Sequence, residues 1–143
     1  MRDDPARPGR GSAAILPEGL LSPPTTEKIK RRHMRINILG TDYLVKELPE
    51  GEDRRLEECT GYCDQYTKTI VVNNCETLKD DVMAVGNIEE FKKRVLRHEI
   101  IHAFLCESGL QTCSEWAENE EMVDWFATQF SKIEKVFQEI GLV

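Results

Sequence analysis

The sequence has no apolar run long enough to cross a lipid bilayer, which takes about 20 residues. Its N-terminal apolar stretch, SAAILPEGLLSPP at 12–24, is interrupted by proline and glutamate, so it does not fit the apolar core of a signal peptide. The total length of 143 residues suits one domain with a modest core. We therefore expect a single-domain cytoplasmic protein that does not enter a membrane.

Basic residues are scarce after residue 33. Residues 34–143 contain 12 Lys and Arg against 22 Asp and Glu, whereas residues 1–33 contain seven against four. An acidic body of this kind lacks the basic face that binding to nucleic-acid phosphates requires. The short basic segment EKIKRR at 27–32 is interpreted as part of a solvated tail. We expect no direct binding to nucleic acid.

The five cysteines are an odd number, and no secretory signal accompanies them. This favours reduced thiols over a disulfide framework. Cys59 and Cys63 have C-x3-C spacing, but the sequence lacks a second matching pair. Small buried apolar thiols are therefore a better interpretation than a structural zinc site.

Residues 1–33 contain five of the six prolines and no periodic apolar pattern, which predicts a disordered N-terminal extension. The folded pattern begins at Met34. One hypothesis is that Met34 is the natural start of the protein and that the preceding residues lie upstream of it. Residues 34–143 form the predicted domain.

Within this domain the pattern predicts an α+β fold. MRINILG at 34–40 and TDYLVKEL at 41–48 alternate in polarity and form a predicted hairpin, and two further strands are predicted near 61–64 and 69–73. A helix is predicted from Ile88 to about Glu107, with Gly109 as its C-terminal cap. The capping-box spacing in TCSE at 112–115 predicts the start of a second long helix. In that helix, apolar residues recur at spacings of three and four: Val123, Phe126, Phe130, Ile133, Phe137 and Ile140. The expected architecture is a small antiparallel or mixed sheet of about four strands followed by two long helices.

The sequence has only three histidines. Two of the three histidines, His98 and His102, stand in the segment RHEIIH at 97–102. On a helix they lie one turn apart on one face, so both imidazoles can reach a single tetrahedral metal ion. Glu99 is displaced from them by about 100° around the helix. From there it lies beside the metal, where a carboxylate acts as a base on water, and not on the metal itself.

A catalytic zinc ion usually has three protein ligands, so a third is needed. His33 lies in the predicted tail and is a poor candidate. On the second helix, the apolar stripe followed backwards from Phe130 arrives at Glu120, with Asp124 one turn later. An acidic pair on a buried face needs a compensating cation. We therefore predict Glu120 as the third ligand and Asp124 as the acceptor for an N–H of a ligand imidazole. The neighbouring Glu118 and Glu121 are the rival ligands and are expected on a solvated face.

The segments HEIIH and NEEMVD (119–124) together resemble the gluzincin pattern, in which HExxH on one helix is followed by NExxxD on the next. More narrowly, NEEMVDWFATQF resembles the ImmA/IrrE family of small metallopeptidases, although Met122 and Val123 replace the usual Glu and Ala. The resemblance extends over residues 61–131, and the helix-turn-helix domain often attached in that family is missing. It implies a minimal zincin-like domain with Zn²⁺ held by His98, His102 and Glu120. It further implies a regulatory protease of bacterial or phage origin that cuts a repressor-type protein.

The predicted function is hydrolysis of peptide bonds by zinc-activated water with Glu99 as general base. Tyr62 and Tyr66 are candidate donors to the oxyanion. The strand TIVVNN at 69–74 is expected to offer a free edge to an extended peptide. Two alternatives are a zincin-fold module that binds zinc and a protein partner without turnover, and a hydrolase of a non-peptide amide. The sequence predicts no oligomeric state.

Overall fold

The computed structural model describes residues 32–78 and 86–143. Its elements are, in chain order, β1 (Arg32–Ile38), β2 (Thr41–Leu48), β3 (Gly61–Asp64), β4 (Thr69–Asn73), α1 (Ile88–Glu107), α2 (Leu110–Cys113) and α3 (Glu120–Glu139). Short 3₁₀ turns η1 (Glu50–Glu52), η2 (Arg54–Glu57), η3 (Glu76–Leu78) and η4 (Glu115–Glu118) join them. The predicted α+β class, with a four-stranded sheet before the helices, is confirmed. The predicted disordered segment lies outside the described residues, except that residues 32 and 33 belong to β1.

The sheet is mixed and has the strand order β1-β2-β4-β3. β1 and β2 form the predicted antiparallel hairpin, β2 pairs with β4 in parallel, and β3 pairs with β4 in antiparallel. The expectation that β4 offers a free edge is therefore wrong, because β4 lies between β2 and β3. Four consecutive residues of β4, 70–73, are buried, and burial on both faces is the property of a central strand. The described sheet has two edge strands, β1 and β3, and β3 has the more extensive contact with α1.

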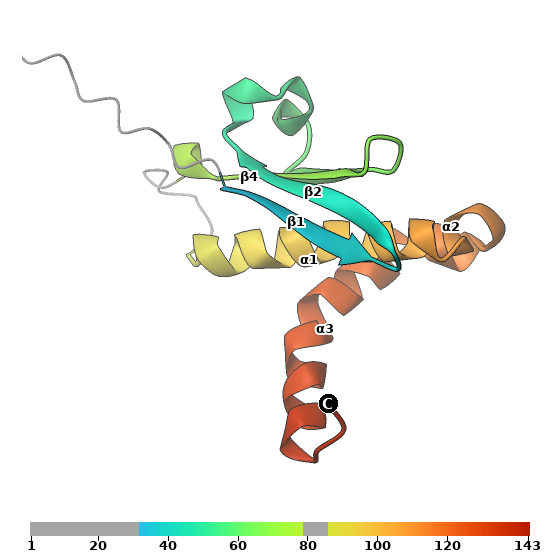
Figure 1. Cartoon of the computed structure of the whole chain (residues 1–143). Helices are drawn as coiled ribbons and strands as arrows, with labels where there is room; N and C mark the ends of the chain where they lie inside the picture. Colours follow the sequence, from blue (N-terminus) through green and yellow to red (C-terminus); the bar gives the residue numbers. More distant parts are fainter. Residues whose placement is uncertain (1–31, 79–85) are drawn as a thin grey trace, which may run out of the picture.

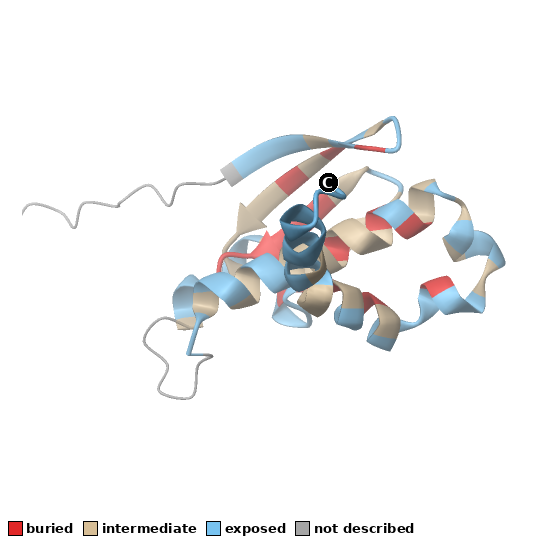
Figure 2. Ribbon diagram, turned by 90° about the horizontal axis from the view of Figure 1, so that it is seen from below, coloured by how far each residue is buried: buried red, intermediate tan, exposed pale blue. Residues whose placement is uncertain are grey.

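Helix α1 lies along one face of the sheet (Figure 1), and both the sheet and the helix contain buried residues (Figure 2). Burial of this apolar surface is the main force that holds α1 on the sheet. The core between them consists of Ile38, Tyr43, Val45, Ile70, Val72 and Ala103.

Three α-helices follow the sheet in the described chain, where two were expected. As predicted, α1 ends at Glu107, and Gly109 takes the left-handed conformation (φ 79°) that suits glycine after a helix. The predicted start of the next helix at 112–115 is wrong. Ser114 is extended, and α3 begins at Glu120, where the side chain of Asn119 accepts a hydrogen bond from the N–H of Met122 at 2.8 Å. Asparagine is a stronger N-cap than threonine, so the helix begins after Asn119 and not after Thr112.

None of the helices in residues 32–78 and 86–143 combines the length and the hydropathy that a membrane crossing requires.

A carboxylate at the end of α1 ties the helix to the sheet. Glu107 accepts hydrogen bonds from Thr41 Oγ1 at 2.8 Å, from the hydroxyl of Tyr43 at 2.7 Å and from Lys68 Nζ at 2.5 Å. The Lys68 ammonium, followed by the two hydroxyl donors, lowers the pKa of Glu107 from 4.5 to about 2. Glu107 thus fixes the C-terminal end of α1 against β2 and the β3–β4 turn.

We expect Glu107→Gln to lower the melting temperature, because the ion pair with Lys68 is lost. A carboxyl whose pKa is depressed by folding stabilises the protein above its ordinary pKa and loses that contribution as the pH falls. The wild type should therefore lose stability between about pH 4.5 and pH 2, and thermal unfolding followed across that range measures it. A Glu107→Gln variant with the same acid dependence as the wild type would contradict this role.

Candidate metal centre

His98 and His102 lie one turn apart on α1 and point toward the same space. Their Nε2 atoms are 3.0 Å apart, and their ring centroids are 4.8 Å apart. Burial lowers the pKa of His102, an effect that the negative charge of Glu120 opposes. Loss of the proton favours neutral imidazole, the form that binds metal ions.

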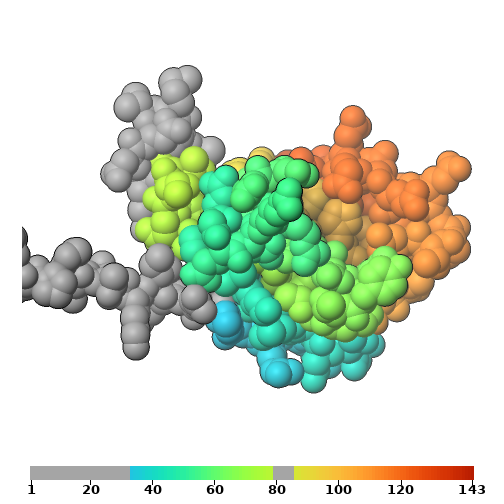
Figure 3. Space-filling model, turned by 90° about the horizontal axis from the view of Figure 1, so that it is seen from above, coloured from blue at the N-terminus to red at the C-terminus, as the bar shows by residue number. Residues whose placement is uncertain are grey.

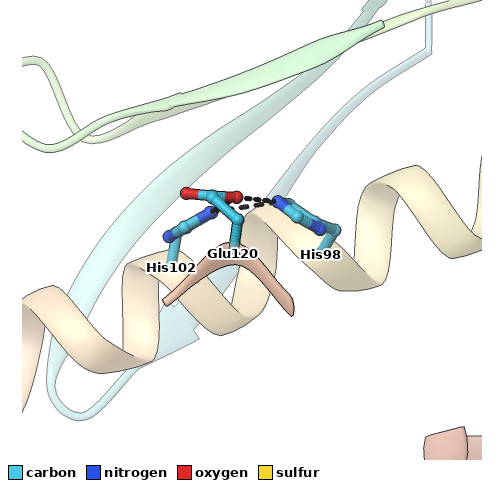
Figure 4. A group of neighbouring side chains, drawn as sticks. All are labelled: His98, His102 and Glu120. Carbon is cyan, nitrogen blue, oxygen red and sulfur yellow. Dashed lines mark hydrogen bonds and ion pairs between the residues drawn. The ribbon is translucent and has the colours of Figure 1, made fainter. Parts of the chain in front are cut away.

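Glu120 is the first residue of α3 and reaches across to both histidines (Figure 4). Its Oε2 atom lies 3.1 Å from Nε2 of His98 and 3.3 Å from Nε2 of His102. Ligands placed about 2.0–2.1 Å from a tetrahedral zinc ion are separated from one another by about 3.3 Å. The three ligand atoms therefore have the mutual spacing that a zinc ion needs. In the part of the chain that the structure describes, this trio is the one such group.

The two predicted site carboxylates of α3, Glu120 and Asp124, are exposed, contrary to the expectation that they face the core. The side chain of Glu120 is 68 % exposed and that of Asp124 is 61 % exposed. The buried positions of α3 belong to Val123 and Ala127. Because α3 begins at Glu120, no earlier turn of the helix covers this side chain. Both carboxylates face His98 and border an open cleft.

Asp124 fixes the orientation of His98. The Nδ1 atom of His98 lies 3.0 Å from Oδ1 of Asp124. A carboxylate only accepts, so Nδ1 carries the hydrogen and donates it. In the neutral imidazole this leaves a lone pair on Nε2, directed at the space shared with His102 and Glu120. The structure thus brings Asp124 to the position predicted for it.

Two contacts hold α3 where Glu120 can reach the histidines, and the sequence predicts neither of them. Val123 packs with Leu105 of α1 and with Ala117 of η4 in a separate buried cluster. Arg97, immediately before His98, donates from Nε to the backbone carbonyl of Ala127 at 2.6 Å. A helical carbonyl that accepts a second hydrogen bond leaves no local pattern in the sequence.

Glu99 is buried, with 7 % of its surface exposed, and is not part of the ligand trio. Burial raises its pKa to about 7, the negative charge of Glu120 contributes in the same direction, and the charge of His98 opposes both. A carboxyl with a pKa near neutrality can both take up and release a proton at neutral pH. The structure thus brings Glu99 to the cleft that contains both histidines, and its role as a general base stays a prediction.

Gly61, at the start of β3, lies so close to α1 that any larger residue would force a neighbouring side chain to shift. A Cβ atom there would lie 2.8 Å from Cγ1 of Val95 and 3.3 Å from Cγ of Glu99. The absence of a side chain lets β3 pack directly on the helix turn that bears Glu99. The sequence alone does not reveal this role, because a glycine in a strand can equally mark a bulge or a bend.

The centre opens into a cleft of about 980 Å³. The segment from η2 to β3 forms one side and residues of α1 and α3 form the other. In the space-filling view the green surface of that segment lies beside the orange surface of the helices (Figure 3). Of the two predicted oxyanion donors, Tyr62 lines this cleft, but its hydroxyl donates to Oδ2 of Asp53 at 2.5 Å. Tyr66 is 89 % exposed in the β3–β4 turn and is not brought to the centre.

We expect the purified protein to bind one zinc ion per chain and His98→Ala and Glu120→Ala to bind none, as measured by metal analysis after dialysis. Glu118→Ala, an exposed neighbour, is the matched control and should keep the zinc. Because metal binding is linked to folding, zinc at 100 times its dissociation constant should stabilise the fold by about 2.7 kcal/mol. Thermal unfolding that a chelator leaves unchanged would count against the centre.

For Gly61→Ala we expect a loss of about 1–3 kcal/mol in unfolding free energy, since the added methyl group must displace Val95 or Glu99. Chemical denaturation measures it. Gly51→Ala is the matched control, because a Cβ at Gly51 meets nothing within 4 Å. Equal stability of the two variants would show that the approach of β3 to α1 is not as tight as described.

No protein-family model, no curated protein and no solved structure matches this chain. The assignment of a function therefore depends on the geometry of the centre and on the sequence patterns that form it.

Proposed function

We propose that the protein is a zinc-dependent metallopeptidase whose general base is Glu99. The observation that supports this most strongly is the position of Glu99 itself. It is a buried carboxyl beside a His–His–Glu ligand trio, and it does not take part in that trio. Burial of a carboxyl is costly, and a site that only binds metal has no use for one at this position.

The centre has the ligand set for zinc, with two imidazole nitrogens, one carboxylate oxygen and space on the cleft side for a fourth ligand. When bound there, zinc would polarise a substrate carbonyl and lower the pKa of a water molecule to about 7. The Glu99 carboxylate accepts the proton of the attacking water and then donates it to the leaving amine. Asp124 holds the ring of His98 in the ligating tautomer throughout.

A peptide is the substrate class that the surroundings favour. β3 is one of the two edge strands of the described sheet, and it lies against the turn of α1 that bears Glu99, where Gly61 allows the close approach. An extended peptide can add to such an edge through backbone hydrogen bonds, which requires no particular side chains. We therefore propose that the peptide pairs with β3, and not with β4 as the sequence led us to expect. The open cleft leaves room for the side chains of the peptide.

The resemblance of HEIIH and NEEMVDWFATQF to the ImmA/IrrE family supports a narrower proposal. We propose a minimal zincin-like domain that acts as a regulatory protease of bacterial or phage origin. Its substrate would be a repressor-type regulator, cut within an extended segment that can pair with β3. In the NExxxD part of that resemblance, Asn119 is the N-cap of α3 and Glu120 is the first residue of the helix.

We expect Glu99→Gln to keep its zinc and its fold while kcat/KM falls by about 10²–10⁴-fold, since the amide cannot accept the proton. The substrates to test are repressor-type proteins encoded next to this gene, with cleavage followed by mass spectrometry. Glu89→Gln is the matched control, because Glu89 is an exposed glutamate on the same helix.

The outcomes separate the rival functions. A wild type that binds zinc but cuts none of the regulators or a random peptide library would favour a zinc-binding interaction module. Cleavage by Glu99→Gln at the wild-type rate would remove Glu99 from the mechanism. Hydrolysis confined to small acylated amines would point to a non-peptide amide as the substrate.

A further inference from the structure

The C-terminal half of α3 leaves the rest of the molecule. Figure 1 shows it pointing away from the sheet and from α1, and Figure 2 shows its surface as exposed. The buried residues of α3 are Val123 and Ala127, both in its first half. The helix nevertheless ends in an ordered cap. Gly141 is left-handed (φ 72°), and the N–H groups of Gly141 and Leu142 donate to the carbonyls of Gln138 and Phe137.

This free half bears a continuous apolar stripe, which we call the α3 stripe: Phe130, Ile133, Phe137 and Ile140. Phe130 is 50 % exposed, Phe137 is 41 % exposed and Ile140 is 65 % exposed. The spacing of three, four and three continues the series from Val123 and Phe126, which gives the seven-residue repeat of a coiled-coil seam. An isolated helix of this length is marginal in water, so a stripe of this kind is typical of a helix that packs on another helix.

We propose that the partner of the α3 stripe is the same stripe of a second copy of this chain, in the antiparallel direction. In heptad terms, the stripe has phenylalanine at each a position and isoleucine at each d position. An antiparallel copy therefore pairs Phe130 with Ile140 and Ile133 with Phe137, and every layer contains one aromatic and one aliphatic side chain. A two-fold axis relates the copies, so the interface closes on itself.

A parallel copy fits less well for two reasons. It would place phenylalanine on phenylalanine and isoleucine on isoleucine. It would also require the N-terminal part of the seam, where Val123 is already packed against Leu105 of α1. The antiparallel copy uses only the part of α3 that α1 leaves free. It also keeps the two metal centres, at the opposite end of α3, open to solvent.

The size of the stripe predicts a weak dimer. Each phenylalanine can bury about 150–250 Å², so a half-exposed stripe contributes on the order of 400 Å² per copy. The total, about 800 Å², is below the ~1,200 Å² at which stable interfaces begin. Association should therefore depend on concentration and be lost readily when one side chain is changed.

Sedimentation velocity of the full chain from about 5 to 500 µM tests the proposal. We expect the mass to rise from one chain toward two, Phe137→Glu to remain monomeric at every concentration, and Lys135→Glu, on the opposite face of α3, to behave as the wild type. Circular dichroism and zinc content show that each variant is folded. A wild type that stays monomeric would overturn the proposal and leave a helix of another protein as the occupant, and so would dimerisation of Phe137→Glu.

The direction of pairing has its own test. In the antiparallel dimer Glu134 lies beside Glu134 of the other copy near the axis, whereas in a parallel dimer it would lie beside Gln129. Like charges at this position repel, and opposite charges attract. An equimolar mixture of wild type and Glu134→Lys should therefore associate several-fold more tightly than either protein alone. A mixture no tighter than its components would overturn the antiparallel arrangement.

Discussion

The contact between α1 and α3 is the constraint on which the centre depends. His98 and Glu120 are 22 positions apart in the sequence, and His98 and Asp124 are 26 apart, yet each pair lies about 3 Å apart. The apolar cluster around Val123 fixes the position along α1 at which α3 crosses it. The hydrogen bond from Arg97 to the backbone carbonyl of Ala127 fixes the distance between the two helices. A small rotation of α3 would carry Glu120 out of reach of both histidines.

The arrangement at this crossing could hold a cation. Two imidazole nitrogens and one carboxylate oxygen converge within 3.0–3.3 Å, and the hydrogen bond to Asp124 removes the proton of His98 from the shared space. When both imidazole nitrogens in this space carry lone pairs, they and the carboxylate oxygen repel one another at such distances. A divalent metal ion bound there would relieve that repulsion. The burial of Glu99 beside it then gives the centre a group that can move a proton.

Some of these features follow from the sequence. Local alternation, helical periodicity and glycine set the strands of the sheet and the end of α1 at Glu107, so the sequence predicts them closely. The HEIIH spacing is also local, because a helix places residues four apart on one face. The sequence points to Glu120 for a reason that the structure does not support, since the side chain is expected to be buried and is exposed.

The remaining features depend on long-range packing. Parallel pairing of β2 with β4 has no local signal, and it makes β3 an edge strand beside α1. The predicted start of α3 is misplaced because two capping sequences compete, and tertiary packing of Val123 favours the later one, at Asn119. A glycine is needed at position 61 because a Cβ atom there would lie too close to Val95 of α1, which is 34 positions further along the chain.

The central claim is that two histidines and one glutamate, and no cysteine, hold a zinc ion. Cys59, Cys63 and Cys106 line the same cleft and are the competing ligands. X-ray absorption spectroscopy of the zinc-loaded protein distinguishes the two ligand sets most directly. We expect only nitrogen and oxygen neighbours, at about 2.0–2.1 Å, whereas a sulfur neighbour at about 2.3 Å would contradict the proposed ligand set.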